Sequence, residues 1–362
     1  MVDILRFRKE DLISYTIAFM SKLGVPASDA KIAGDVLVEA DIRGIDSHGL
    51  IRLTTYYGSR LKNKYMNPKT PIRVVSETDS TILLDGGNGL GQVAAYRAME
   101  ECIEKAKKAN VSIATVNHSN HYGIAAYYAL MALDYDMIGI SLTNSQPLVA
   151  PTYGRTAVLG TNPICLAAPS YKKYPYVLDM ATSVVPIGRI KVYEKKGQKL
   201  PLGWGVDDEG NITDDPKKVK SGGPGALLPL GGSDIMRGYK GYGLALLVDI
   251  LCGALSGAGT LLDVGFPHEP KESNVGHFFM AIKIDAFRPV IDFKKQIDYM
   301  IETLKNSPKA AGQEHIYIAG EKEFEKADYN RKHGVPLLTK VVKEIKENGK
   351  RVGVPFDIEP IG

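Results

Sequence analysis

The chain has 362 residues, a formal net charge of +4 and a hydrophobic fraction of 44%, which support a large core in one big domain or two intertwined lobes. The small net charge, without a basic block interleaved with aromatic residues, argues against nucleic-acid binding. The three cysteines form no Cys-x-x-Cys pair, which favours a reducing compartment. The N-terminus lacks the apolar core of a signal peptide, and we expect a cytoplasmic protein.

The first sixty residues have helical patterns. Residues 9–23 and 28–42 predict two helices, since the glycine and proline between them end the first one. A third helix is expected over 47–62, and either Asp46 or Ser47 would cap its N-terminus.

The middle of the chain predicts a sheet. Residues 72–85 alternate as strands or a hairpin, and 91–109 predict a helix with one apolar stripe. An apolar run at 111–116, a helical pattern at 123–134 and a second apolar run at 137–143 follow. Strand, helix and strand at this length indicate a right-handed parallel crossover.

The second half adds strands in "PICLAAP", in "YVLDM" and over 277–284, and glycine-rich loops over 193–235. Residues 241–262 are long enough to span a membrane, but Asp249 interrupts them, so we expect a buried helix and no membrane association. From residue 291 onward the pattern predicts amphipathic helices and a short strand, "IYIAG". The fold class is α/β or α+β with a mixed sheet.

Two histidines, His118 and His121, stand in "NHSNHYG" where a predicted strand leads into a helix. Ligands in open α/β sheets bind at such positions. A zinc site would need a third ligand, and none stands nearby, so no metal is expected. Loop histidines that cap the helix are one alternative. We favour acid/base chemistry, because imidazole titrates near neutral pH.

A second polar group lies on the predicted helix 47–62. His48, Arg52 and Tyr56 fall at i, i+4 and i+8 and therefore share one face. A solvated surface face is the plain alternative, although such faces are usually rich in Lys and Glu. Arginine binds carboxylates through two parallel hydrogen bonds, so this face suggests a site that holds a small acid and moves a proton.

A dinucleotide fingerprint is absent. "GGNGLGQ" at 86–92 has the wrong glycine spacing, and no acidic residue ends the next strand, so a Rossmann domain is not expected. The residues alone indicate an enzyme with an acid/base histidine and leave hydride transfer undecided. A hydrolase or lyase that uses both histidines, and a non-catalytic small-molecule binding protein, stay open.

Five segments together resemble one family: "ADIRGIDSHGLIRL", "NHYGIAAYYAL", "LGTNPICLAAP", "LDMATS" and "GYKGYGLALLVDIL". The chain resembles the malate/L-lactate dehydrogenase family, which includes L-sulfolactate and ureidoglycolate dehydrogenases, diketogulonate reductase and cyclic imino acid reductases. The resemblance implies a mixed-sheet α/β fold of the L-sulfolactate dehydrogenase type, not a Rossmann domain, with helical N- and C-terminal segments. It also implies a homodimeric, NAD-dependent oxidoreductase of small 2-hydroxy or 2-oxo acids, with NADP as the alternative cofactor.

The resemblance also implies roles for particular residues. His121 is expected to be the acid/base, with His48 polarising the substrate oxygen or sharing that role. Arg52 is expected to hold the substrate carboxylate, assisted by Ser47 and Tyr56. The residues expected to contact the cofactor are Ser145, Thr161, Asn162, Asp179, Met180, Ala181, Lys240, Asn274, Gly320 and Glu321.

Two lobes are expected: residues 1–115 with 291–362 as a helical, substrate-binding and dimerisation lobe, and 116–290 as a cofactor-binding lobe. Malate/oxaloacetate is the expected substrate pair. Within the family the alternatives are reduction of cyclic imino acids, or of another 2-oxo acid such as sulfopyruvate or diketogulonate.

Overall fold

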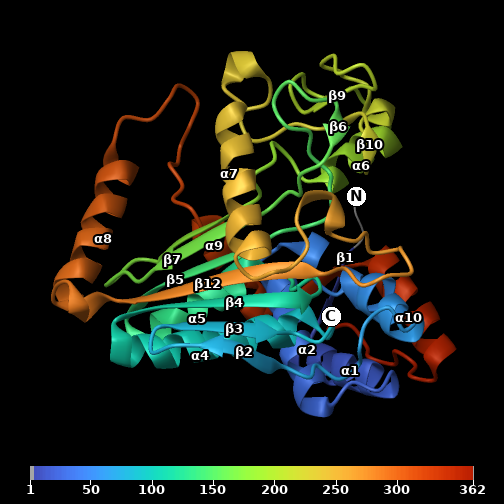
Figure 1. The fold of residues 1–362 in the computed structure, drawn as a ribbon, viewed down its shortest axis with the longest axis horizontal. Coiled ribbons are helices and arrows are strands. Elements are labelled where there is room, and N and C mark those ends of the chain that lie inside the picture. The colour runs from blue at the N-terminus through green and yellow to red at the C-terminus, as the bar shows by residue number, and fades with distance from the viewer. Residues whose placement is uncertain (1–3, 362) are drawn as a thin grey trace.

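A seven-stranded mixed sheet forms the centre of the molecule in the computed structural model, which describes residues 4–361 (Figure 1). The strand order is β2-β3-β4-β12-β5-β7-β8. Their bounds are Arg73–Glu77, Thr81–Asp85, Val111–Ser119, Val275–Lys283, Met137–Thr143, Ile164–Ala168 and Tyr176–Met180, in that order. This confirms the mixed α/β class.

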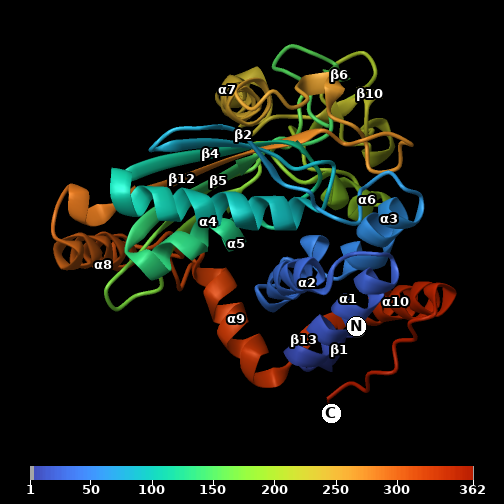
Figure 2. The same cartoon turned by 60° about the horizontal axis from the view of Figure 1, so that its bottom comes forward.

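Helices cover both faces of this sheet. α4 (Gly91–Ala109) and α5 (Ala125–Met131) pack on one face, and α7 (Tyr239–Asp249) lies on the other (Figure 2). The predicted apolar stripe of α4 is fully buried against the sheet and includes Met99 and Ile103. Burial of that stripe, rather than helix propensity alone, fixes α4 in place.

The predicted strand–helix–strand unit is present as β4, α5 and β5. Both strands pair antiparallel with β12 and therefore run parallel to each other. β12 lies between them, although it follows β5 by more than 130 residues. The sequence around β4 and β5 does not predict this insertion, because the inserted strand comes from a distant segment of the chain.

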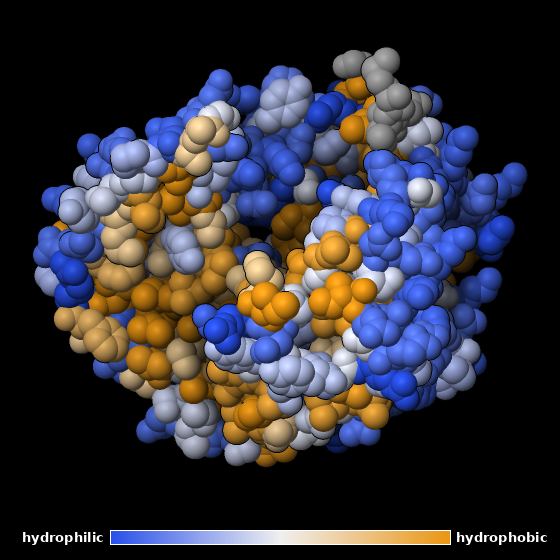
Figure 3. Space-filling view, turned by 90° about the horizontal axis from the view of Figure 1, so that it is seen from above, coloured by the Kyte–Doolittle hydropathy of each residue, from blue (hydrophilic) through white to orange (hydrophobic). Residues whose placement is uncertain are grey.

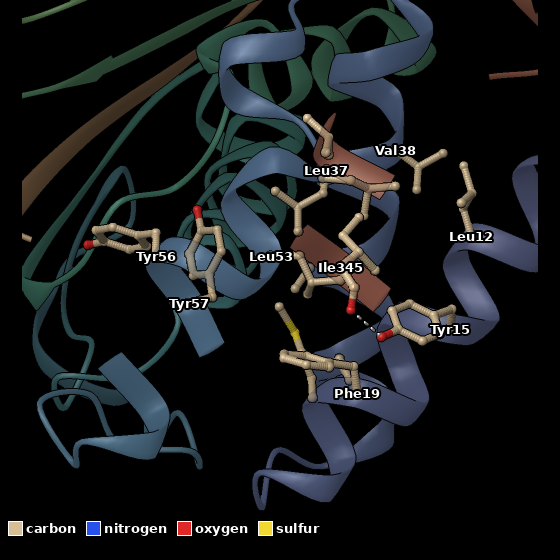
Figure 4. Close-up of a cluster of buried hydrophobic side chains, with 14 of the residues drawn as sticks. Leu12, Tyr15, Phe19, Leu37, Val38, Leu53, Tyr56, Tyr57 and Ile345 are labelled. Carbon is tan, nitrogen blue, oxygen red and sulfur yellow. Dashed lines mark hydrogen bonds between the residues drawn. The ribbon is translucent and has the colours of Figure 1, made fainter. Parts of the chain in front are cut away.

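A helical layer formed by both ends of the chain packs beside the sheet. It contains α1 (Lys9–Lys22), α2 (Ala27–Ile42) and α10 (Thr339–Val352). The strands β1 (Ile4–Phe7) and β13 (Val335–Leu338), which the sequence did not predict, pair antiparallel and join the two termini. These elements share one apolar core, part of which is drawn in Figure 4.

The remaining elements lie at the periphery. The longer ones are α3 (Ser59–Lys62), α6 (Ile187–Lys196), α8 (Val290–Asn306) and α9 (Glu321–His333). Four two-residue strands, β6 (Thr156–Ala157), β9 (Gly205–Val206), β10 (Gly223–Pro224) and β11 (Ala226–Leu227), brace the predicted loop region. Within the described residues, no helix is long and apolar enough to cross a membrane.

The expected helix over 47–62 is present from residue 51 onward and is wrong at its start. A 3₁₀ turn at Asp46–His48 precedes it, and the helical residues 51–62 include a π-helical turn at Leu53–Gly58 and end in the short α3. Gly49 has an extended ψ of −150° and interrupts the helix. Neither Asp46 nor Ser47 caps the segment through its side chain.

Two further expectations were wrong in part. The segment 241–262 is not buried all round, because Leu247 in α7 is 44% exposed and Ile250, in the π-helical turn Ile250–Ala254 that follows, is 53% exposed. "IYIAG" forms no strand. The Val177 backbone N–H in β8 donates a hydrogen bond to the Ala319 carbonyl oxygen, which holds this segment beside β8 without extending the sheet.

Candidate active site

A cavity of about 650 Å³ lies between the helical layer and one end of the sheet. Its walls come from the segment 44–56, the loop after β4, the loops that follow β5 and precede β7, the start of α6 and the strand β13. The volume falls in the range of small-molecule sites. The predicted site residues that line it are Ser47, His48, Arg52, Tyr56, His121, Ser145 and Thr161.

Asp41 on α2 holds the segment that carries His48. Its buried carboxylate accepts a hydrogen bond of 2.8 Å from the Leu50 backbone N–H. A Cβ added at Gly49 would lie 2.0 Å from Asp41 Oδ1, so only glycine lets the backbone approach this closely. Asp41 therefore takes the capping role that the sequence suggested for Asp46 or Ser47.

His48 and Arg52 are bound to the same short turn. The Ser47 hydroxyl lies 2.9 Å from His48 Nδ1, and Arg52 Nε donates to the Ser47 carbonyl oxygen at 2.9 Å. In the described part of the chain, the two terminal nitrogens of Arg52 have no hydrogen-bond partner. They are left as a planar donor fork facing the cavity.

His121 stacks against His48, with ring centroids 5.4 Å apart and planes inclined by 22°. The hydroxyl of Tyr57 lies 2.7 Å from His121 Nδ1, and the hydroxyl of Tyr56 accepts a hydrogen bond from the His121 backbone N–H at 3.3 Å. Nε2 has no partner among the described residues. The ring is therefore held through Nδ1, and Nε2 is left for a ligand.

Both imidazoles are neutral at neutral pH. Removal from water, followed by the positive charge of Arg52, lowers the pKa of His48 to about 4. The pKa of His121 is held well below its usual value by desolvation first, then by His48, Arg52 and His277. A bound carboxylate would raise both values, because its charge favours the imidazolium form.

The loops after β5 and before β7 form the opposite wall. The Thr161 backbone N–H donates to Ser145 Oγ at 3.0 Å, and the two hydroxyls lie 3.3 Å apart. Asn162 is fully buried behind this wall and accepts from the Ser145 N–H at 3.1 Å. Its amide also donates to Asp249 on α7, so Asn162 positions the wall from behind and does not line the cavity.

The other expected cofactor residues do not line this cavity. Asp179 accepts a hydrogen bond from the Ala126 N–H at 2.8 Å and so caps α5. Met180 ends β8 and Ala181 follows it, while Lys240 lies exposed near the start of α7.

Asn274 stands between two cavity residues, Ser273 and Val275, with a φ of +48°. Gly320 is the N-cap residue before α9, and the carboxylate of Glu321 pairs with Lys305 beside a second cavity of about 520 Å³. These residues are therefore not gathered with the two stacked histidines.

The two histidines of "NHSNHYG" separate. His118 lies outside the main cavity and bridges Asp85, at 3.2 Å, and Glu272, at 2.6 Å. Sequence analysis missed His277, which is fully buried, stacks on Tyr122 at 4.7 Å and bonds Ser119. A single histidine within an apolar strand does not by itself predict that its ring is buried and stacked on a tyrosine.

The stacked imidazoles and the unpaired guanidinium nitrogens in one cavity are chemically suited to proton exchange with a bound small carboxylate. Residues 7–346 match the family described as Malate/L-lactate dehydrogenase, and the chain belongs to it. It is an oxidoreductase of hydroxy acids that uses a nicotinamide cofactor.

Relatives agree over almost the whole chain. The chain is 51% identical to malate dehydrogenase of Pyrococcus horikoshii, over 97% of each protein. It is 40% identical to L-sulfolactate dehydrogenase of Methanocaldococcus jannaschii, covering 94% of this chain and 95% of the relative. The crystal structure of malate dehydrogenase from Entamoeba histolytica superposes with a TM-score of 0.92 at 35% identity, over 98% of this chain and 100% of the other. The non-Rossmann fold expected from the sequence is confirmed.

Proposed function

We propose that this protein is a malate dehydrogenase that interconverts malate and oxaloacetate with NAD. The observation that carries the proposal is the unpaired guanidinium fork of Arg52 beside the stacked pair His48 and His121, in one cavity. The roughly 50% identity to a relative named malate dehydrogenase supports the choice of substrate.

In the proposed mechanism, Arg52 binds the C1 carboxylate of the substrate through two parallel hydrogen bonds. His121 Nε2 takes the proton of the C2 hydroxyl during oxidation and returns it during reduction. His48 polarises the same oxygen, and Ser47 and Tyr56 contact the substrate. A bound nicotinamide supplies or accepts the hydride, and the protein contributes orientation and the proton.

The cavity suits a nicotinamide ring beside the substrate. Its walls include the apolar side chains of Leu148, Ile187 and Val192 next to the hydroxyls of Ser145 and Thr161. Ser273 borders the cavity with a buried hydroxyl that has no partner among the described residues. We propose that the rest of the cofactor is held, by direct contact or through neighbouring residues, by Asn162, Asp179, Met180, Ala181, Lys240, Asn274, Gly320 and Glu321.

A second cation supports a dicarboxylate substrate. Arg189 lines the cavity from the first turn of α6 and forms no ion pair within residues 4–361. We propose that it meets the distal carboxylate of malate. Arg189→Met should lower kcat/KM for oxaloacetate about tenfold and leave pyruvate nearly unchanged, because pyruvate lacks that group. An equal loss for both acids would contradict this role.

The main test follows NADH, then NADPH, by absorbance with oxaloacetate, pyruvate, sulfopyruvate, diketogulonate and a cyclic imine. The fastest turnover is expected with oxaloacetate and NADH. Turnover without nicotinamide would indicate a hydrolase or lyase, and cofactor binding without turnover would indicate a binding protein. A faster rate with the imine would select the reductase alternative.

Two variants test the assigned residues. His121→Ala should lower kcat by at least about a hundredfold, the usual contribution of a general acid/base, with little change in cofactor affinity. Arg52→Lys should raise the Michaelis constant for oxaloacetate, because lysine cannot form the two parallel bonds. An unchanged Michaelis constant would contradict the carboxylate assignment.

We also propose that the chain forms a homodimer. α7 exposes Leu246 and Leu247, the π-helical turn after it exposes Ile250, and α8 exposes Met300 and Leu304. Figure 3 shows apolar side chains gathered in a hollow on this side of the molecule. Exposed apolar side chains that gather on one face are typical of an association face. Light scattering of the wild type should give twice the mass of one chain. Leu247→Glu should lower the measured mass toward that of one chain, and a monomeric wild type would refute the proposal.

The remaining parts of the proposal concern lobes and location. The cavity is lined by residues 4–56 and 336–341 of the expected substrate lobe and by residues 121–275 of the expected cofactor lobe, which supports a site between the two lobes. All three cysteines are free and buried, which supports a reducing, cytoplasmic location.

A further inference from the structure

Tyr57 makes a contact with His121 that none of the roles above uses. It belongs to the π-helical turn Leu53–Gly58, and its side chain is fully buried in the core of the helical layer. The wider π turn lets two successive phenols reach one histidine: Tyr56 meets the backbone N–H, and Tyr57 meets the ring. Figure 4 shows both tyrosines beside this core.

The neighbours of Nδ1 determine which nitrogen of His121 carries the proton. The Gly123 backbone N–H, which can only donate, points at Nδ1 from 3.3 Å. The resting neutral ring therefore accepts at Nδ1 and carries its proton on Nε2. In that form Nε2 cannot take a proton from a substrate hydroxyl.

Both reactive forms of His121 need a proton on Nδ1. The base of the oxidation has a lone pair on Nε2 and hence N–H at Nδ1, and the acid of the reduction has N–H at both nitrogens. An acceptor must then face Nδ1. Among the described residues, the Tyr57 oxygen is the group in contact with Nδ1 that can either donate or accept.

The same phenol has a second acceptor within reach. Tyr57 Oη lies 3.3 Å from the His121 carbonyl oxygen, so its O–H can turn there when Nδ1 carries a proton. Burial raises the pKa of Tyr57 well above its usual value, which keeps the phenol protonated. Rotation of one hydroxyl thus serves every protonation state of the imidazole.

We propose that Tyr57 is the positioning residue that lets His121 carry a proton on Nδ1 and so frees Nε2 to exchange a proton with the substrate oxygen. The inference rests on the proposed acid/base role of His121. Tyr57 itself touches neither substrate nor cofactor. The titratable and charged groups that face His121 from the surrounding elements are His48, Arg52, Tyr56, Tyr57 and His277.

The test is Tyr57→Phe, which keeps the ring and removes the hydroxyl. Only the Gly123 N–H then faces Nδ1, which locks the ring in its resting form. We expect kcat to fall about tenfold or more in both directions, with Michaelis constants changed less than about twofold, since the substrate contacts remain. The pKa of His121 should also fall, because the imidazolium loses its acceptor. In each reaction direction, the part of the pH–rate profile that reports the pKa of His121 should therefore move to lower pH.

Tyr15→Phe is the matched control. Tyr15 lies in the same core and bonds the carbonyl oxygens of Ile345 and Val354, away from His121. It should change stability but neither kcat nor the pH profile. A Tyr57→Phe protein with the kcat and pH profile of Tyr15→Phe would overturn the inference.

Nitrogen NMR of histidine-labelled protein gives a readout that does not depend on turnover. The resonances of His121 should show a proton on Nε2 as the main tautomer of the wild type. A minor population with the proton on Nδ1 should also be present, and Tyr57→Phe should abolish it. An identical tautomer mixture in both proteins would overturn the inference while leaving the proposed function intact. Full turnover by His121→Ala would instead remove the acid/base role of His121 on which the inference rests, whereas no turnover of oxaloacetate by the wild type would remove the proposed function.

Discussion

Replacing Asp249 with leucine should loosen the cavity wall formed by Ser145 and Thr161. Asp249 is the single acid in the apolar stretch of α7, and it is buried. Its carboxylate accepts hydrogen bonds from Asn144 at 3.0 Å and from Asn162 at 3.3 Å. Each amide keeps one carbonyl partner, Gly259 for the first and Ala245 for the second, so leucine would leave one N–H of each unpaired.

A buried donor left unpaired costs about 1–3 kcal/mol. Two donors give about 2–6 kcal/mol, and apolar burial of leucine offsets about 1 kcal/mol of this. We therefore expect Asp249→Leu to lower the free energy of unfolding by about 1–5 kcal/mol in urea at fixed protein concentration. Asp249→Asn, which accepts at one oxygen only, should fall between the leucine variant and the wild type.

The cavity should respond in the same variant. Asn162 also accepts from the Ser145 N–H, so its displacement should raise the Michaelis constant for the nicotinamide cofactor. Asp263→Leu, at an exposed position nearby, is the control and should change stability by no more than about 0.5 kcal/mol. An Asp249→Leu protein within about 1 kcal/mol of the wild type, with normal cofactor kinetics, would refute the reasoning.

Two further predictions concern stability. Gly49→Ala should cost about 1–3 kcal/mol and lower kcat, because the new Cβ displaces the Asp41 carboxylate that fixes the His48 turn; Gly243→Ala, with open space at its Cβ, should be neutral or stabilising in a thermal melt. Burial lowers the pKa of His277 to about 3, below its unfolded value, so its contribution is full above about pH 6.5 and is lost as pH falls. His277→Gln should therefore reduce the loss of stability between pH 6.5 and 5 by about 2 kcal/mol in guanidinium chloride, and an unchanged pH slope would argue against neutral burial.

Much of the fold followed from local patterns. The helices 9–23, 28–42 and 91–109 and the strands around 111–116 and 137–143 were predicted nearly in place, because their apolar residues recur with the period of the element. The insertion of β12 and the pairing of β1 with β13 depend on contacts between distant segments. Hydrophobic periodicity in a single sequence indicates the type of an element but not its distant pairing partner.

The site divides in the same way. His48, Arg52, Tyr56 and His121 meet in one cavity, as their local spacing and the resemblance suggested. The residues that hold them, Asp41 and Tyr57 among them, sit in core-like surroundings where a buried polar group gives no pattern. The start of the expected helix over 47–62 was placed too early for a related reason: its cap, Asp41, comes from the preceding helix and not from a neighbouring residue.

The position of β12 has a consequence for synthesis of the chain. Until residue 283 has left the ribosome, β4 and β5 both present unpaired edges to a gap one strand wide. Open edges of apolar strands readily pair with other chains, so a nascent or truncated polypeptide is exposed to aggregation between the synthesis of β5 and that of β12. The sheet closes only near the end, and we expect premature termination before residue 275 to give insoluble product rather than a smaller folded unit.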